Sequence, residues 1–243
     1  MRDLEPAIRS AMDVALEPGD EEAMSVKDQE PLELSDDGRR LWNVAEALDR
    51  ACPHVSLRPR PPLLFLTDPN RTPEPWVVAG RLPPGSGVVY RHFGRDDAQA
   101  TAERLRQITS DRGLRLLIGL DAALAEAVAA DGVHLPERAL AQAPVLRKRF
   151  PGWMLTGALH DGAQPPPRVL DTLDCLVASP VFVSASLSAT RPPLGLEGIR
   201  RLTEDLGLPV YALGGINAET ALHLLDSKVC GLAGVEGFVR AFA

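Results

Sequence analysis

Two polar residues stand at the ends of apolar runs, where a parallel α/β protein carries its chemistry. His160 follows the run MLTGAL and precedes Asp161. An imidazole in such a place can move protons near neutral pH, and an exposed loop histidine is the alternative. Arg91, in YRHFGR, could contact an anion or could be a solvated edge residue. We take both as candidate catalytic residues.

Two adjacent glycines, Gly214 and Gly215, end the run PVYAL and are followed by Asn217. Glycines let an anion approach backbone N–H groups, and a following helix N-terminus adds partial positive charge. The pattern predicts a phosphate-binding site, and a tight turn with a capping asparagine is the alternative.

His134, in ADGVHLP, lies within an apolar run, which favours a packed and hydrogen-bonded histidine over a ligand or a base. It is kept as a candidate substrate-binding residue. Ser184 and Ser186 fall in the long loop VFVSASLSATRPPLGL, which is typical of a lid or substrate cradle; a plain linker is the alternative. We take them as substrate-binding candidates too.

Composition excludes several classes of protein. The 243 residues carry a net charge of −7, but residues 1–38 alone hold twelve acidic and three basic side chains. No basic stripe with interleaved aromatics is present, so no nucleic-acid partner is expected. No apolar run is long enough to span a bilayer. Three cysteines without a CxxC pair favour a reducing cytoplasm over disulfides or structural zinc.

Strand and helix patterns alternate from residue 63 onward, which predicts a parallel sheet buried on both faces. The chain length suits a compact (β/α)8 TIM barrel, with a doubly wound open sheet as the alternative. The expected strands are Leu63–Thr67, Val88–Phe93, Leu114–Gly119, Gly132–Leu135, Met154–Leu159, Cys175–Val181, Val210–Leu213 and Val229–Gly234.

The chain divides into three predicted parts. Residues 1–38 read as a disordered acidic N-terminal extension, because they hold few large apolar residues. Residues 39–61 read as a helix and a proline-rich linker, with the helical pattern itself spanning 36–51. The barrel is expected over residues 62–243.

Between about residues 62 and 240 the chain resembles the thiamine-phosphate synthases and the related thiazole tautomerases. The resemblance lies in FLTDPN, GVHLPE, GALH, ASPVF, LPVYALGGIN and CGLAGVEGF, which occur in the family's order. It implies a barrel that is usually a homo-oligomer, and a small-molecule phosphate ligand held at Gly214 and Gly215. The synthase joins a pyrimidine diphosphate to a thiazole phosphate with Mg²⁺. The tautomerase isomerises a thiazole carboxylate phosphate, and its proton-moving histidine matches His160.

Several positions depart from the synthase pattern. Leu120 and Ala139 stand where its two Mg²⁺-binding aspartates belong, with Asp121 one position along, and Leu187 replaces a lysine. Glu236 replaces a serine beside the phosphate. We therefore expect Mg²⁺-dependent synthase activity to be weak or absent, with Mg²⁺ as a cofactor only if that activity is retained. A His160-dependent isomerase and a non-catalytic thiazole- or partner-binding barrel are the alternatives.

Overall fold

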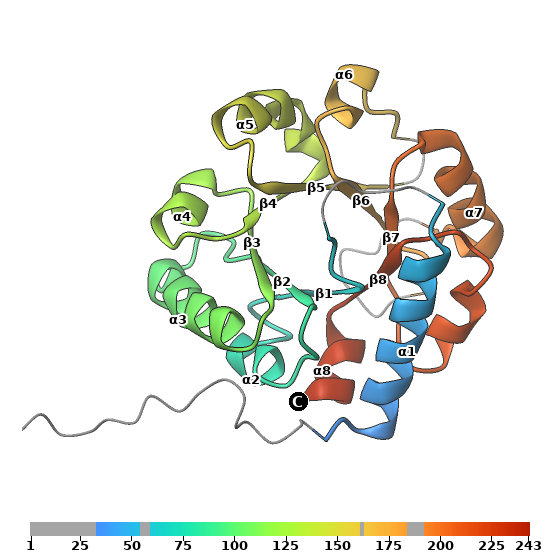
Figure 1. The fold of residues 1–243 in the computed structure, drawn as a ribbon, viewed down its shortest axis with the longest axis horizontal. Coiled ribbons are helices and arrows are strands. Elements are labelled where there is room, and N and C mark those ends of the chain that lie inside the picture. The colour runs from blue at the N-terminus through green and yellow to red at the C-terminus, as the bar shows by residue number, and fades with distance from the viewer. Residues whose placement is uncertain (1–32, 54–58, 161–162, 184–191) are drawn as a thin grey trace, which may run out of the picture. The chain divides into compact units, whose positions relative to one another are not determined.

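The computed structural model describes residues 33–53, 59–160, 163–183 and 192–243. Eight parallel strands close into a barrel in chain order, and helices surround it (Figure 1). The last strand pairs with the first, with Leu64 opposite Ala233. The predicted (β/α)8 barrel is confirmed, and the open-sheet alternative is wrong.

The strands are four to six residues long, and three of them have the predicted bounds. The others begin or end up to three residues inside the expected run, except that β2 begins one residue before it. Their bounds are β1 Leu63–Leu66, β2 Gly87–Tyr90, β3 Arg115–Gly119, β4 Gly132–Leu135, β5 Met154–Leu159, β6 Cys175–Ala178, β7 Val210–Leu213 and β8 Gly231–Gly234.

Alternate strand residues supply two separate apolar layers, since successive side chains point to opposite faces of a sheet. One face packs against the helices, as Phe65 and Val133 do. The other fills the barrel interior with a second cluster, and burying each large side chain there stabilises the fold by about 1.5–3 kcal/mol. The interior cluster comprises Leu64, Leu66, Val89, Leu117, Met154, Cys175, Val177, Tyr211, Cys230 and Ala233.

The helices of the described residues vary in length, and those in proline-rich connections are the shortest. None of the described helices is long and apolar enough to span a bilayer. Their bounds are α1 Asp36–Ala51, α2 Pro75–Ala79, α3 Ala98–Asp111, α4 Ala122–Ala127, the 3-10 helix η2 Glu137–Gln142, α5 Ala143–Arg149, α6 Pro167–Leu170, α7 Gly195–Leu206, the 3-10 helix η3 Thr220–Leu224 and α8 Glu236–Phe242.

Helix α1 belongs to the same compact unit as the barrel, which runs from Leu32 to Ala243. Ser35 caps the helix by accepting a hydrogen bond from the Gly38 N–H at 3.0 Å, and its hydroxyl donates to the Ala241 carbonyl at 2.7 Å. The helix packs on β8 and α8. Residues 36–38 of the predicted tail 1–38 therefore belong to helix α1 instead. Residues 1–32 of that tail lie outside the described part of the chain.

Candidate functional site

The C-terminal ends of the strands open on one side of the barrel, because all eight strands are parallel. We call this side the mouth. The residues that follow the strands there include Thr67 after β1, Arg91 after β2, Leu120 after β3, His160 after β5 and Gly214 after β7. The predicted site residues of the described chain thus come from one end of the barrel, with His134 inside it.

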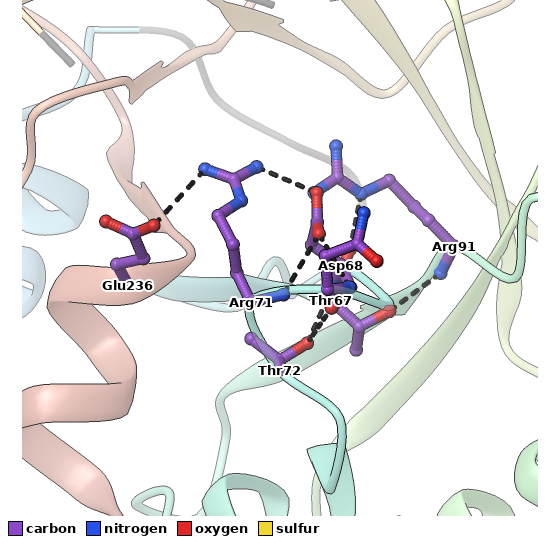
Figure 2. Close-up of polar contacts among 7 residues, drawn as sticks. Thr67, Asp68, Arg71, Thr72, Arg91 and Glu236 are labelled. Atoms are coloured by element: carbon purple, nitrogen blue, oxygen red, sulfur yellow. Dashed lines mark hydrogen bonds and ion pairs between the residues drawn. The ribbon is translucent and has the colours of Figure 1, made fainter. Parts of the chain in front are cut away.

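Arg71, in the loop after β1, lies between two carboxylates. Its Nη2 donates to Asp68 Oδ2 at 2.9 Å, and its Nη1 lies 4.0 Å from Glu236 Oε1 at the start of α8 (Figure 2). Burial alone would raise the pKa of Asp68, but hydrogen bonds from Arg71 and from the Asn70 N–H outweigh it and hold that pKa below its usual range. Glu236, which the family resemblance places beside the predicted phosphate, therefore has a cationic neighbour.

Arg91 extends into the mouth and is held at its base by Thr67. The Arg91 N–H donates to Thr67 Oγ1 at 2.9 Å, and Arg91 Nε donates to the Thr67 carbonyl at 2.7 Å. Its Nη2 is buried and has no hydrogen-bond partner within the described part of the chain. Burial lowers the pKa of this guanidinium to about 10, so it stays charged at neutral pH. A buried cation with an unused donor is suited to an anionic ligand.

His134 lies inside the barrel and is buried. Its Nδ1 lies 2.8 Å from Thr156 Oγ1 on the neighbouring strand. Burial, with the positive charge of Arg91 as a second cause, lowers the pKa of His134 to about 3, so the ring is neutral near pH 7. The packed, hydrogen-bonded interpretation of this residue is confirmed; its contact with a substrate stays a prediction.

His160 is paired with Glu137, which sequence reasoning did not single out. One carboxylate oxygen, Glu137 Oε2, accepts from the His160 backbone N–H at 2.9 Å and lies 2.7 Å from His160 Nδ1. The imidazole and the carboxylate are each about one third exposed. Such a pair is suited to acid–base chemistry, in which a second residue orients the group that moves the proton, and the catalytic role of His160 stays a prediction.

Gly214 and Gly215 both have positive φ, at 98° and 67°. A Cβ on Gly214 would lie 2.9 Å from Pro180, and one on Gly215 would lie 2.6 Å from the Val183 carbonyl oxygen. The side-chain space of both glycines is therefore taken by the loop after β6. Their N–H groups donate no hydrogen bond to another described residue. The alternative, a tight turn with a capping asparagine, is supported because the Asn217 side chain accepts from the Thr220 N–H at 2.9 Å. Phosphate binding at the two glycines stays a prediction.

The residues at the expected Mg²⁺ positions do not fit that ion. Leu120 is an apolar side chain at the mouth, 38% exposed, and Ala139 is buried in η2. Asp121 caps α4 by accepting from the Leu124 N–H at 2.9 Å, and its other oxygen lies 3.5 Å from His92 Nε2. Mg²⁺ requires oxygen ligands in octahedral geometry, which leucine and alanine cannot supply. In the described part of the chain, no group of three or more His, Cys, Asp or Glu could hold a metal.

Ser184, Ser186 and Leu187 lie outside the described residues, so their predicted roles are untested. No sequence motif pointed to Arg71 or Glu137 as residues of the mouth. Only their positions could have indicated them, because each follows the C-terminal end of a strand by a few residues.

Comparisons with known proteins agree with the barrel and its motifs. The family model described as thiamine monophosphate synthase matches residues 77–238. A thiamine-phosphate synthase of Chloroflexus aurantiacus is 30% identical over 68% of this chain and 77% of that protein. One of Albidiferax ferrireducens is 32% identical over the same shares.

Among solved structures, the fold is similar to that of a thiamine phosphate pyrophosphorylase of Pyrococcus furiosus. The TM-score is 0.59 at 24% identity, over 74% of this chain and 90% of that one. At that identity the likeness supports the barrel fold alone. The family match covers well over half of the residues. The chain is therefore a member of the thiamine monophosphate synthase family.

Proposed function

We propose that this family member of thiamine biosynthesis binds a thiazole phosphate at the mouth and has weak or absent Mg²⁺-dependent synthase activity. The observation that carries the proposal is Leu120. It stands where the synthase resemblance requires a carboxylate, and its neighbour Asp121 is engaged as a helix cap and by His92. A departing diphosphate develops negative charge that a metal and cations must stabilise. Without oxygen ligands at these positions that stabilisation is lost.

Two features of the mouth support a phosphate ligand. Among the described residues, the N–H groups of Gly214 and Gly215 have no acceptor, and the buried Nη2 of Arg91 has no hydrogen-bond partner. Glu236 acts against an anion, and its proximity to Arg71 reduces that repulsion. The phosphate-bearing ligand, a homo-oligomer and a cytoplasmic location are predictions that go with this proposal.

A single-turnover assay tests the proposal. The protein is mixed with thiazole phosphate, pyrimidine diphosphate and Mg²⁺, and thiamine phosphate is followed by mass spectrometry. We expect binding of the thiazole phosphate but no product above the no-enzyme control. Product at a rate typical of enzymes, on the order of 1 s⁻¹ or faster, would refute the weak-synthase proposal.

A gain-of-function variant tests the same point from the other side. Leu120→Asp, Ala139→Asp and Leu187→Lys together restore the charges of the synthase pattern, and we expect turnover to rise above that of the parent chain. Because Ala139 is buried, its change will lower stability, so folding is checked first by circular dichroism. No gain in a folded variant would count against these three positions as the cause.

A second candidate function is an isomerase that moves a proton through His160, as the tautomerase resemblance implies. The specific observation in its favour is the Glu137–His160 pair, because an oriented imidazole is what proton transfer requires. A thiazole carboxylate phosphate incubated with the protein in D₂O should incorporate deuterium. His160→Ala should abolish that exchange, and His223→Ala, at an exposed position on η3, should leave it unchanged.

A further inference from the structure

Glu137 contacts His160 at two points through a single oxygen. Oε2 accepts from the backbone N–H at 2.9 Å and faces Nδ1 at 2.7 Å. An ionised carboxylate can only accept hydrogen bonds. The proton of the neutral imidazole therefore lies on Nδ1, and the lone pair lies on Nε2.

We propose that Glu137 is a positioning residue, which fixes this tautomer and orients His160 so that Nε2 is the atom that exchanges protons with a ligand. The proposal rests on the His160-dependent candidate function given above. His160 Nε2 has no hydrogen-bond partner among the described residues, whereas Nδ1 is fully engaged. The imidazole therefore has one nitrogen held by the protein and one nitrogen available.

The barrel itself sets the distance between the two residues. Strands β4 and β5 are neighbours in register, with Leu135 opposite Gly157, so the chain brings Glu137 and His160 side by side just beyond the strand ends. Pro136 fixes the backbone before Glu137, and its carbonyl accepts from the Ala139 N–H at 2.8 Å as η2 begins. The carboxylate thus comes from a short, backbone-bonded segment rather than from a long loop.

His92 provides an internal contrast at the same mouth. Its Nδ1 accepts a hydrogen bond from the Gly94 N–H at 3.1 Å, and its Nε2 lies 3.5 Å from Asp121 Oδ2. A ring nitrogen that accepts an N–H bond carries no proton, so neutral His92 is protonated on Nε2. The two histidines should therefore be opposite tautomers, His160 on Nδ1 and His92 on Nε2.

Nitrogen NMR of the imidazoles tests this directly, without any ligand. The chain has five histidines, so a protein labelled with ¹⁵N-histidine gives a countable spectrum, and His160→Gln and His92→Gln assign the two signals. At a pH where a titration shows both rings to be neutral, we expect the Nδ1–H form for His160 and the Nε2–H form for His92. The Nε2–H form at His160 in the parent protein would overturn the proposal.

Two variants of Glu137 separate positioning from general damage to the fold. Glu137→Ala removes the acceptor and should move His160 toward the Nε2–H form that free histidine prefers. Glu137→Gln keeps an acceptor oxygen and should retain Nδ1–H. The matched control is Glu126→Gln, which removes an exposed carboxylate bound to Arg149 at 2.9 Å and should leave both histidines unchanged. An unchanged His160 tautomer in a folded Glu137→Ala protein would refute the role of Glu137.

Deuterium exchange of the thiazole carboxylate phosphate then separates this proposal from the function on which it rests. If the parent protein exchanges, Glu137→Ala should lower kcat roughly 10- to 100-fold, with KM less affected and Glu137→Gln intermediate. If the parent does not exchange, the isomerase function fails. The assignment of Glu137 as the residue that sets the tautomer still stands or falls on the NMR result alone.

Discussion

Arg71 lies 4.0 Å from Glu236 across the junction of β1 and β8, while the same guanidinium is bound to Asp68 at 2.9 Å. The chain thus brings a cation to the carboxylate that replaces a serine beside the predicted phosphate site. This relationship makes Glu236 a position at which anion affinity can be measured by substitution.

Glu236→Ser should strengthen binding of thiazole phosphate by about 3- to 10-fold, because a partly exposed like charge nearby costs on the order of 1 kcal/mol. Isothermal titration calorimetry gives the affinity. The control is Glu197→Ser on α7, which removes an exposed carboxylate that lies 3.8 Å from Arg201. Equal affinity in the parent and the Glu236→Ser protein would mean that the phosphate does not approach this end of α8.

Leu120→Asn should stabilise the fold. Leu120 has φ of 66°, a left-handed conformation that costs a leucine about 1–2 kcal/mol and costs asparagine less. Its side chain is 38% exposed, so the substitution also removes some buried apolar surface, and that loss offsets part of the gain. We expect the free energy of unfolding in urea to rise by about 0.5–1 kcal/mol. Leu196→Asn, at 39% exposure in α7, should lower it instead.

His134 should make the fold sensitive to acid. Its pKa is lowered to about 3 in the folded state, against about 6.5 unfolded, so between these values only the unfolded chain binds the proton. The stability it contributes is fully present above pH 6.5 and is lost as pH falls, by up to about 1.4 kcal/mol per pH unit.

Urea unfolding at pH 7, 5.5 and 4.5 measures this slope. His134→Gln should flatten the acid side of the profile, although it lowers stability at pH 7 because the buried contact with Thr156 changes. His223→Gln, at an exposed position, should leave the slope as it is. If His134→Gln leaves the pH dependence of the free energy of unfolding unchanged, then groups other than His134 cause the loss of stability in acid.

Asp174 should stabilise the fold at the end of the barrel opposite the mouth, where it directly precedes β6. Its Oδ2 accepts from the Leu155 N–H at 2.7 Å and from Arg147 at 2.6 Å. Asp131 makes the same pair of contacts, with the Leu116 N–H at 2.7 Å and Arg106 at 2.9 Å, two strands earlier. The repeat indicates a structural device that fixes the strand beginnings.

Asp174→Ala should therefore lower the free energy of unfolding by about 2–3 kcal/mol, since it leaves a backbone N–H and a guanidinium without their acceptor. Asp174→Asn, which can still accept from Leu155, should cost less. Asp171→Ala, at an exposed position in the same segment, serves as the control. A loss no larger than that of the control would contradict the stabilising role.

The strands were predictable because both faces of each are buried and the sequence signal is therefore a nearly continuous apolar run. Their ends were less so. Val88–Phe93 was expected to continue as a strand, but β2 ends at Tyr90, because Arg91 and the residues after it bond within the loop and to Thr67. The helix that was expected to follow Gly214 and Gly215 is only the 3-10 helix Thr220–Leu224.

The sequence predicted which residues lie at the mouth, but it did not predict which of them contact one another. Strand order and register place His160 at the end of β5, which the alternating pattern anticipates. The pairing with Glu137 depends on which neighbouring loop turns inward, and the proximity of Arg71 to Glu236 depends on barrel closure between β1 and β8. Both join residues far apart in the sequence, where no local pattern carries information.

The hydrogen bond between Ser35 and Ala241 joins residues 206 positions apart. Helix α1 packs on β8 and α8, which come last in the sequence. Its apolar face therefore stays exposed to solvent until the C-terminal part of the barrel has been synthesised and has folded. A circular permutant that connects the end of α8 to Ser35 through a short linker, and opens the chain before β1, would keep that contact and make it local. Such a chain should fold faster at similar stability, since a contact between residues 206 positions apart would have become a local one.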